Sequence, residues 1–208
     1  MLNPSLQYYC ETEVIPHYAS FDAAHREDHA RSVIERSLHL ARNYPVNEDM
    51  VYAAAAFHDM GLSAGRETHH LESGRIIRSD ARLPEWFSRE EIEIIAQAAE
   101  DHRASAKSEP RSIYGRILAE ADRLIVPQTV IRRTVQYGLS HYPDLDREGH
   151  WQRTLEHLRE KYGYGGYLKL WLPESENAAP LEELRRTIAD TEKLRAVFDG
   201  IFNDLLHL

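Results

Sequence analysis

Four ionisable side chains fall on faces of predicted helices that are otherwise apolar. They are His29, His58, Asp59 and Asp122. Asp122, for example, follows Leu118 by one helical turn, where a purely structural helix would place an apolar residue. The sequence therefore predicts that separate helices direct two imidazoles and two carboxylates toward one interior point.

A divalent cation at that point would account for all four groups. A buried carboxylate is costly unless a cation or a hydrogen-bond partner compensates it. Two neutral imidazoles and two carboxylates bring a charge of about −2, and their nitrogen and oxygen atoms suit several metals. We expect one or two ions per chain, of Mn, Fe, Ni, Co or Mg. Such a centre can lower the pKa of bound water toward ~7 and polarise a phosphoryl oxygen.

Two further histidines lie on apolar stripes of other predicted helices. His70 shares a face with Gly74 and Ile77, and His102 continues a stripe through Ala99. We expect both side chains to point inward, either toward a functional site or as hydrogen-bonded core residues. His69, next to His70, is expected to face solvent.

The elements that would position these groups are all helical. Apolar residues recur at three- and four-residue steps, and alternating runs typical of strands are hard to find. The pattern predicts an all-α fold with helices at 5–15, 26–43, 47–59, 69–81, 88–104, 111–125, 127–139, 149–162 and 180–206. Asn47 is a predicted N-cap, and Ser88 with Glu91 a predicted capping box. Gly61 is expected to end the helix that carries the His58-Asp59 pair.

The stretch 162–177 is the most loop-like part of the chain, with three glycines and a proline. It is a candidate lid or a boundary before the C-terminal helix. Its segment YGYGGYLKLW alternates glycines with rings that could stack on a base, although core packing is the favoured interpretation.

Composition narrows the class of function. The chain has 208 residues, a formal net charge of −9 and one cysteine, Cys10. Scattered basic residues disfavour non-specific binding to nucleic acid, and no apolar run is long enough for a membrane span. We expect a cytoplasmic protein that binds a small ligand. The oligomeric state stays open, with a homodimer as one candidate.

Five segments, read in order and spacing, carry a family resemblance. They are HREDHARSVIERSLHLA, AAAAFHDMG, HHLESG, AAEDHRAS and PRSIYGRILAEADRL. Together they resemble the HD-domain metal-dependent phosphohydrolases, most of all a small single-domain bacterial class. The resemblance covers about residues 20–135. It implies one HD-type helical domain over 1–208, with a C-terminal helical extension at about 140–208.

The resemblance also implies roles for particular residues. His29 would be the first metal ligand, His58 and Asp59 the HD pair, and Asp122 the closing ligand. Asp59, His70 and His102 would serve catalysis, either through a second metal bridged by Asp59 or by contacting the substrate phosphate; the sequence does not decide between these. His25 matches an extra histidine ahead of the first ligand and is expected to bind substrate. Arg123 matches the arginine after the last ligand, which would contact phosphate or brace Asp122.

Two departures from the family pattern concern Leu62. Many relatives read HDxGK, whereas this chain has Leu62 in place of the lysine, so Arg66, Arg75 or Arg103 would have to meet the phosphate. In the nucleotidase branch the same position is acidic, and Leu62 disfavours that mechanism.

Three functions are consistent with these residues. The first is a phosphohydrolase acting on a phosphate ester or anhydride, with a nucleotide as the expected substrate and triphosphate-to-monophosphate cleavage as one reaction. The second is a nucleotide-sensing module with a structural metal, which the missing lysine motivates. The third is a di-iron oxygenase, because a minority of HD-fold enzymes oxidise substrates at histidine-rich dinuclear sites.

Overall fold

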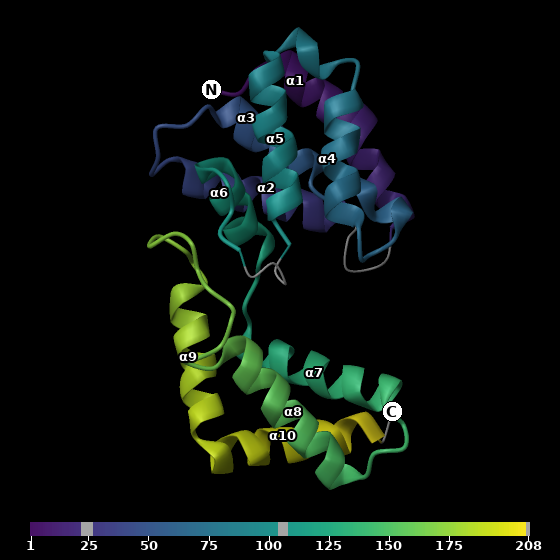
Figure 1. Cartoon of the computed structure of the whole chain (residues 1–208), viewed down its shortest axis with the longest axis vertical. Coiled ribbons are helices and arrows are strands. Elements are labelled where there is room, and N and C mark those ends of the chain that lie inside the picture. Colours follow the sequence, from purple (N-terminus) through teal and green to yellow (C-terminus); the bar gives the residue numbers. More distant parts are fainter. Residues whose placement is uncertain (22–26, 104–107, 207–208) are drawn as a thin grey trace. The chain divides into compact units, whose positions relative to one another are not determined.

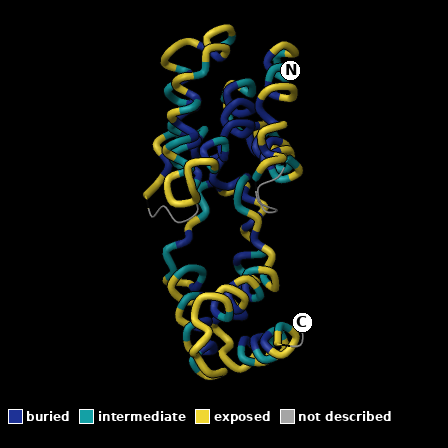
Figure 2. Tube along the Cα trace, turned by 90° about the vertical axis from the view of Figure 1, so that its right-hand side faces the viewer, coloured by how far each residue is buried: buried dark blue, intermediate teal, exposed yellow. Residues whose placement is uncertain are grey.

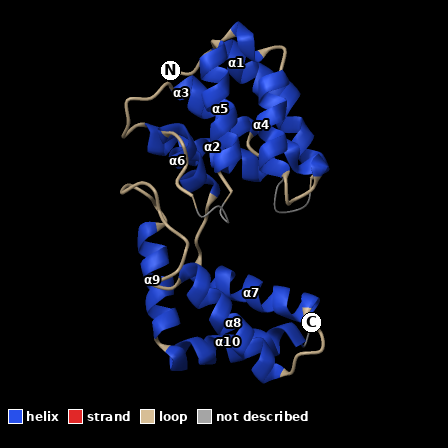
Figure 3. Cartoon of the chain, in the orientation of Figure 1, coloured by secondary structure: helices blue, strands red, loops and turns tan. Residues whose placement is uncertain are grey.

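The computed structural model describes residues 1–21, 27–103 and 108–206. Within these ranges the chain is helical and contains no strand (Figure 3), which confirms the predicted all-α class. None of the helices in this described part has the length and apolar character that a membrane span requires.

The chain divides into two compact units, each with its own core. The N-terminal unit comprises Met1–Arg123 with Trp171–Ser175, and the C-terminal unit comprises Leu124–Leu170 with Glu176–Leu208. This differs from the expected single domain with an HD core to about 135. The helix after Pro127 contributes Ile131 and Val135 to the second core, so the boundary falls at Arg123.

The N-terminal unit consists of α-helices together with shorter 3-10 and π-helices (Figure 1). Its α-helices are α1 (Pro4–Tyr9), α2 (Glu27–Ala41), α3 (Glu48–Phe57), α4 (His69–Ser79), α5 (Arg89–Asp101) and α6 (Ile113–Asp122). A short π-helix (Cys10–Val14) and 3-10 helices (Ile15–Ser20, Met60–Ala64, Leu83–Glu85) lie between some of them. The predicted helix at 5–15 is thus a short α-helix followed by a π-helix.

Helix α3 occupies the interior of the N-terminal unit. Asn47 caps it, since its side chain accepts a hydrogen bond from the Asp49 N–H at 3.0 Å. The run Ala53–Ala56 is buried, and α3 packs against α2, α5 and α6. Small side chains let these helices approach closely. Figure 2 shows buried residues gathered inside each unit and exposed residues on the outer faces.

The segment Trp171–Ser175 belongs to the N-terminal unit although it follows much of the C-terminal one. The Trp171 N–H donates to Oε1 of the buried Glu120 at 2.6 Å, and the Ser175 hydroxyl donates to Oε2. Leu172 joins the core. Part of the predicted loop 162–177 therefore satisfies a buried carboxylate on α6.

The C-terminal unit contains α7 (Pro127–His141), α8 (Arg147–Tyr162), α9 (Ala178–Ala189) and α10 (Thr191–Leu206). The predicted single helix at 180–206 is wrong, because the chain leaves helical geometry at Asp190. The Asp190 carboxylate accepts the Lys193 N–H at 3.0 Å and so starts a new helix.

Candidate metal centre

The His58-Asp59 pair lies at the end of α3 inside the N-terminal unit. The exposed fractions of the two residues are 0% and 2%. His58 Nδ1 lies 2.8 Å from the carbonyl oxygen of Ala55, and because a carbonyl can only accept, Nδ1 carries the hydrogen. This leaves His58 Nε2 directed at Asp59 Oδ2, 3.3 Å away.

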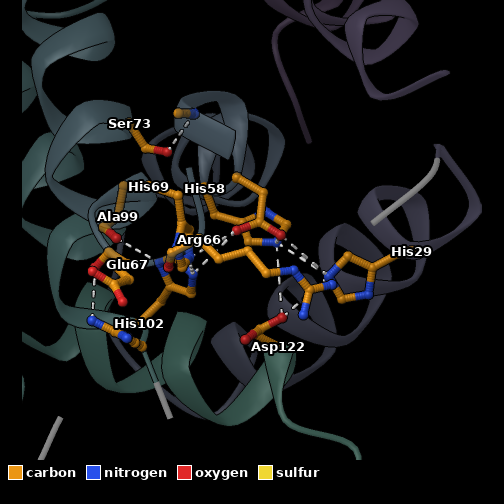
Figure 4. Close-up of polar contacts among 12 residues, drawn as sticks. His29, His58, Arg66, Glu67, His69, Ser73, Ala99, His102 and Asp122 are labelled. Carbon is orange, nitrogen blue, oxygen red and sulfur yellow. Dashed lines mark hydrogen bonds and ion pairs between the residues drawn. The ribbon is translucent and has the colours of Figure 1, made fainter. Parts of the chain in front are cut away.

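Helices α2 and α6 bring the other two predicted ligands to this pair. His29 Nε2 lies 3.3 Å from His58 Nε2 and 3.2 Å from Asp122 Oδ1. The same nitrogen lies 3.8 Å from Asp59 Oδ2. The four residues predicted as metal ligands therefore come together, and Figure 4 shows His29 and Asp122 facing each other beside His58.

A second group of histidines faces the other oxygen of Asp59. His69 Nε2 and His102 Nε2 lie 3.3 Å and 3.4 Å from Asp59 Oδ1. Each ring is oriented by a backbone carbonyl, with Nδ1 of His69 2.8 Å from Arg66 O and Nδ1 of His102 2.5 Å from Ala99 O. We call His29, His58, Asp59, His69, His102 and Asp122 the metal cluster.

The histidine from α4 in this cluster is His69, whereas the sequence pattern favoured His70 and placed His69 in solvent. The His69 side chain is only 13% exposed. Periodicity could not separate the two residues, because Ser73 and Gly74, one turn further along α4, are both buried. The His70 ring stacks edge-on to that of His69, with centroids 5.6 Å apart, and His70 belongs to neither metal-binding group found among the described residues.

Comparison with protein families identifies the segment that holds the cluster. The family model described as HD domain matches residues 26–126, a range that includes all six cluster residues. Residues 26–126 therefore form an HD domain. Searches of curated proteins and of solved structures found no match.

The HD domain offers a donor set that fits a metal ion. Two groups of three residues have ligand atoms within 4.8 Å of one another: His29, His58 and Asp59, and Asp59, His69 and His102. Asp59 is common to both groups. Imidazole nitrogens with carboxylate oxygens suit first-row divalent metals better than they suit Mg²⁺, which prefers oxygen ligands.

The surrounding charges keep both carboxylates of the metal cluster, Asp59 and Asp122, ionised. Burial raises the pKa of Asp59, but His58 and His102 outweigh burial and hold this pKa well below its usual range. Burial also raises the pKa of Asp122, while the hydrogen bond with His29 and the nearby imidazoles lower it to about 2. Burial lowers the pKa of His58, yet the two carboxylates raise it to about 9. Without a cation the two carboxylates hold a proton on His58. A divalent ion bound to the cluster could replace that proton.

Gly61 lets the start of α4 approach the HD pair. A Cβ atom on Gly61 would lie 2.1 Å from His69 O and 2.6 Å from Ser73 N, both backbone atoms. The Gly61 N–H donates to Ser73 Oγ at 2.9 Å. The predicted role of Gly61 was to end α3, but α3 already ends at Phe57. Gly61 instead permits the close contact that brings His69 to Asp59.

Among the arginines proposed to replace the family lysine, Arg66 lies at the cluster. Its side chain extends toward Asp122 and His29 in Figure 4. Together with Phe21 and Leu62 it lines a cavity of about 320 Å³. Arg75 is two-thirds exposed and pairs with Glu72, so it is not available for this role.

The other predicted substrate-binding residues have different positions. Arg103 donates to Glu67 O at 2.8 Å and so holds the loop before His69. Arg123 lies 3.5 Å from Glu120, the buried carboxylate of α6. His25 lies outside the described residues.

Tyr18 is a neighbour of the HD pair that sequence reasoning missed. Its hydroxyl donates to Ala56 O at 3.0 Å and accepts the Asp59 N–H at 3.2 Å. Burial raises the pKa of Tyr18 well above its usual value. Tyr18 therefore stays protonated and fixes the backbone at Asp59; nothing in its sequence context distinguished it from a core aromatic residue.

Proposed function

We propose that the HD domain hydrolyses a phosphate ester or anhydride, using one or two divalent cations. The position of Asp59 is the observation that carries this proposal. One carboxylate oxygen faces His58 and the other faces His69, at 3.3 Å in each case. A buried carboxylate placed between two sets of imidazoles suits a group that bridges two cations better than it suits a core residue.

The cluster divides naturally between two ions. His29, His58, Asp59 and Asp122 would hold one cation, and His69 and His102 would share a second through Asp59. The two carboxylates neutralise only one divalent ion, so the second would be retained best together with the anionic substrate. Mn²⁺, Fe²⁺, Co²⁺ and Ni²⁺ are the candidates that the nitrogen-rich donor set favours.

A bound divalent cation would lower the pKa of water and polarise a phosphoryl oxygen. The residues of the chain supply the rest of the mechanism. Arg66 would hold phosphate oxygens and so replace the family lysine. Backbone carbonyls keep the Nε2 atoms of His69 and His102 turned toward Asp59, which limits the reorganisation needed during reaction. Tyr18 holds the backbone of the HD pair in position.

A nucleotide is the proposed substrate, as the family resemblance implies. The cavity beside Arg66 supports this choice because Phe21 and Leu62 offer apolar surface for a base while the arginine offers a cation. Cleavage of a nucleoside triphosphate to the monophosphate and pyrophosphate is one such reaction.

The test measures release of phosphate or pyrophosphate from a panel of nucleotides with Mn²⁺, Co²⁺ or Ni²⁺. We expect His58→Ala and Asp59→Ala to lower kcat more than about a hundredfold, as loss of a central electrostatic group does. His17→Ala, at an exposed position on the same unit, is the matched control and should keep full activity. Circular dichroism checks that the variants fold. Activity that survives both substitutions would reject the proposal.

The alternative of a nucleotide sensor with a structural metal rests on Leu62. The cation that Leu62 does not supply could come from Arg66, which favours the hydrolase. Calorimetry separates the two: a sensor would bind a nucleotide with no turnover under any metal or pH, whereas measurable hydrolysis would end that alternative.

A further inference from the structure

The C-terminal unit contains a cavity of about 450 Å³ that the hydrolase proposal does not use. The end of α8, the glycine turn at 163–166 and helix α9 form its walls. Its volume is within the range of small-molecule sites, about 300–1,000 Å³. The lining residues used below are Arg159, Glu160, Tyr164, Arg185 and Ile188.

Two arginines at this cavity differ from four other arginines of the unit in having no carboxylate partner among the described residues. Arg159 donates to the Thr191 hydroxyl at 3.2 Å, and Arg185 donates to Tyr162 O at 3.2 Å, so each is oriented by a neutral oxygen. Across the described part of the C-terminal unit, neither of them forms an ion pair. Four other arginines of this unit do pair with carboxylates: Arg132, Arg147, Arg186 and Arg195. The guanidinium groups at the cavity therefore keep their charge available for an anion.

The exposed aromatic ring of Tyr164 lines the same cavity. Tyr164 is 61% exposed, and its hydroxyl donates to Glu182 at 2.8 Å, which limits its rotation. The Arg185 guanidinium carbon lies 6.0 Å from the centre of the ring. The sequence pattern favoured core packing for the rings of this segment, but Tyr164 is free to stack on a ligand.

The glycine turn holds Tyr164 close to the end of α8. A Cβ atom on Gly163 would lie 2.7 Å from Arg159 O, and one on Gly166 would lie 2.7 Å from Lys161 O, so the turn packs tightly against the helix. A Cβ on Gly165 would meet nothing within 4 Å. The turn thus has one packed side and one open side, and the open residue lines the cavity.

We propose that this cavity binds a small anion that carries an aromatic ring, with a nucleoside monophosphate as the representative ligand. Arg159 and Arg185 contact the phosphate, Tyr164 stacks on the base, and Ile188 provides an apolar floor. Glu160 is the one carboxylate in the lining, so the two guanidinium groups leave a net positive charge. In a chain with a net charge of −9, such a locally positive cavity favours a small anion over a polyanion such as nucleic acid.

The experiment is isothermal titration calorimetry of the full chain carrying Asp59→Ala, which removes the bridging ligand of the metal cluster. The titrants are AMP, adenosine and inorganic phosphate. We expect one AMP per chain, bound at least about tenfold more tightly than either fragment, because the site recognises both charge and ring. Arg159→Gln should weaken AMP binding about tenfold and Tyr164→Ala about three- to tenfold. Arg132→Gln, which removes a paired arginine on α7, should leave it unchanged.

Three outcomes would overturn the proposal. They are no AMP binding at millimolar concentration, adenosine or phosphate bound as tightly as AMP, and unchanged AMP affinity in Arg159→Gln and Tyr164→Ala. Both substituted side chains are exposed, so the core of the unit is retained, and circular dichroism verifies this. AMP bound in the cavity beside Arg66, which Asp59→Ala leaves in place, would not respond to Arg159→Gln or Tyr164→Ala. Failure of the proposed function and failure of this proposal are therefore distinguishable.

Discussion

His58 and His150 are both buried histidines, one in each unit, and their electrostatic environments are opposite. Their exposed fractions are 0% and 2%. Burial lowers the pKa of His150, and Arg153 lowers it further. Burial also disfavours the charged form of His58, but Asp59 and Asp122 raise the pKa of His58 to about 9. Burial alone keeps an imidazole neutral, so a charged histidine in a core indicates carboxylates that were placed beside it.

The same contrast extends to the two units. The C-terminal unit keeps its ion pairs at the surface, as in Arg147 with Asp199 at 2.9 Å and Arg195 with Glu148 at 2.7 Å. Arg195 interrupts the apolar stripe of α10, and the pair with Glu148 supplies its guanidinium group with a carboxylate. The N-terminal unit has surface ion pairs as well, such as Arg78 with Glu93, but it also holds the buried Asp59 against imidazoles. Buried charge is a poor source of stability, so its presence points to a site with a function.

The largest expected effect is that a metal stabilises one unit only. At about 1,000 times its Kd, Mn²⁺ should add about 4 kcal/mol to the free energy of opening of the N-terminal unit, because it binds the folded cluster alone. Amide hydrogen exchange resolves the two units, and protection in α8 and α10 should not change. Equal protection of both units, or protection that persists in Asp59→Ala, would contradict the comparison.

The second effect concerns pH in metal-free protein. Because the pKa of His58 is about 9 when folded and 6.5 when unfolded, its ion pairs contribute about 3 kcal/mol that is fully present below pH 6.5 and lost as pH rises to 9. His150, whose pKa is lowered, should instead cost stability as pH falls below 6.5. Denaturant unfolding of His58→Ala and His150→Ala against the parent chain measures both slopes. Slopes of the same sign would break the contrast.

The third prediction concerns the close contact between Gly61 and the start of α4. Gly61→Ala should destabilise the N-terminal unit by about 1–3 kcal/mol and weaken Mn²⁺ binding, because the new methyl group would displace the backbone at His69. Gly200→Ala is the matched control on α10, where a Cβ meets nothing within 4 Å, and it should stabilise by about 0.5–1 kcal/mol. If Gly61→Ala bound Mn²⁺ as tightly as the parent chain, this account of α4 packing would be wrong.

The smallest effect separates two adjacent histidines. His69→Ala should lower Mn²⁺ affinity or the number of bound ions, by about tenfold or more in affinity, because it removes an imidazole 3.3 Å from Asp59. His70→Ala should stay within about threefold of the parent chain. Titration of Mn²⁺ followed by electron paramagnetic resonance measures both, and a larger loss in His70→Ala would reverse the assignment.

The sequence by itself determined the helical class and most of the metal cluster. Polar residues on apolar stripes, together with the order of the family motifs, identified His29, His58, Asp59, His102 and Asp122 as inward-facing groups. These signals are local, because a helix face repeats every three to four residues and a cap depends on its nearest neighbours.

Only the tertiary structure decided which of two adjacent histidines joins the cluster, where the units divide and what surrounds Glu120. Neighbouring residues on a helix differ by about 100°, so both can border one buried face, and packing at Gly61 selects His69. The return of Trp171–Ser175 to the N-terminal unit joins residues far apart in the chain. Contacts of this kind depend on how the helices pack together, which a periodic pattern does not specify.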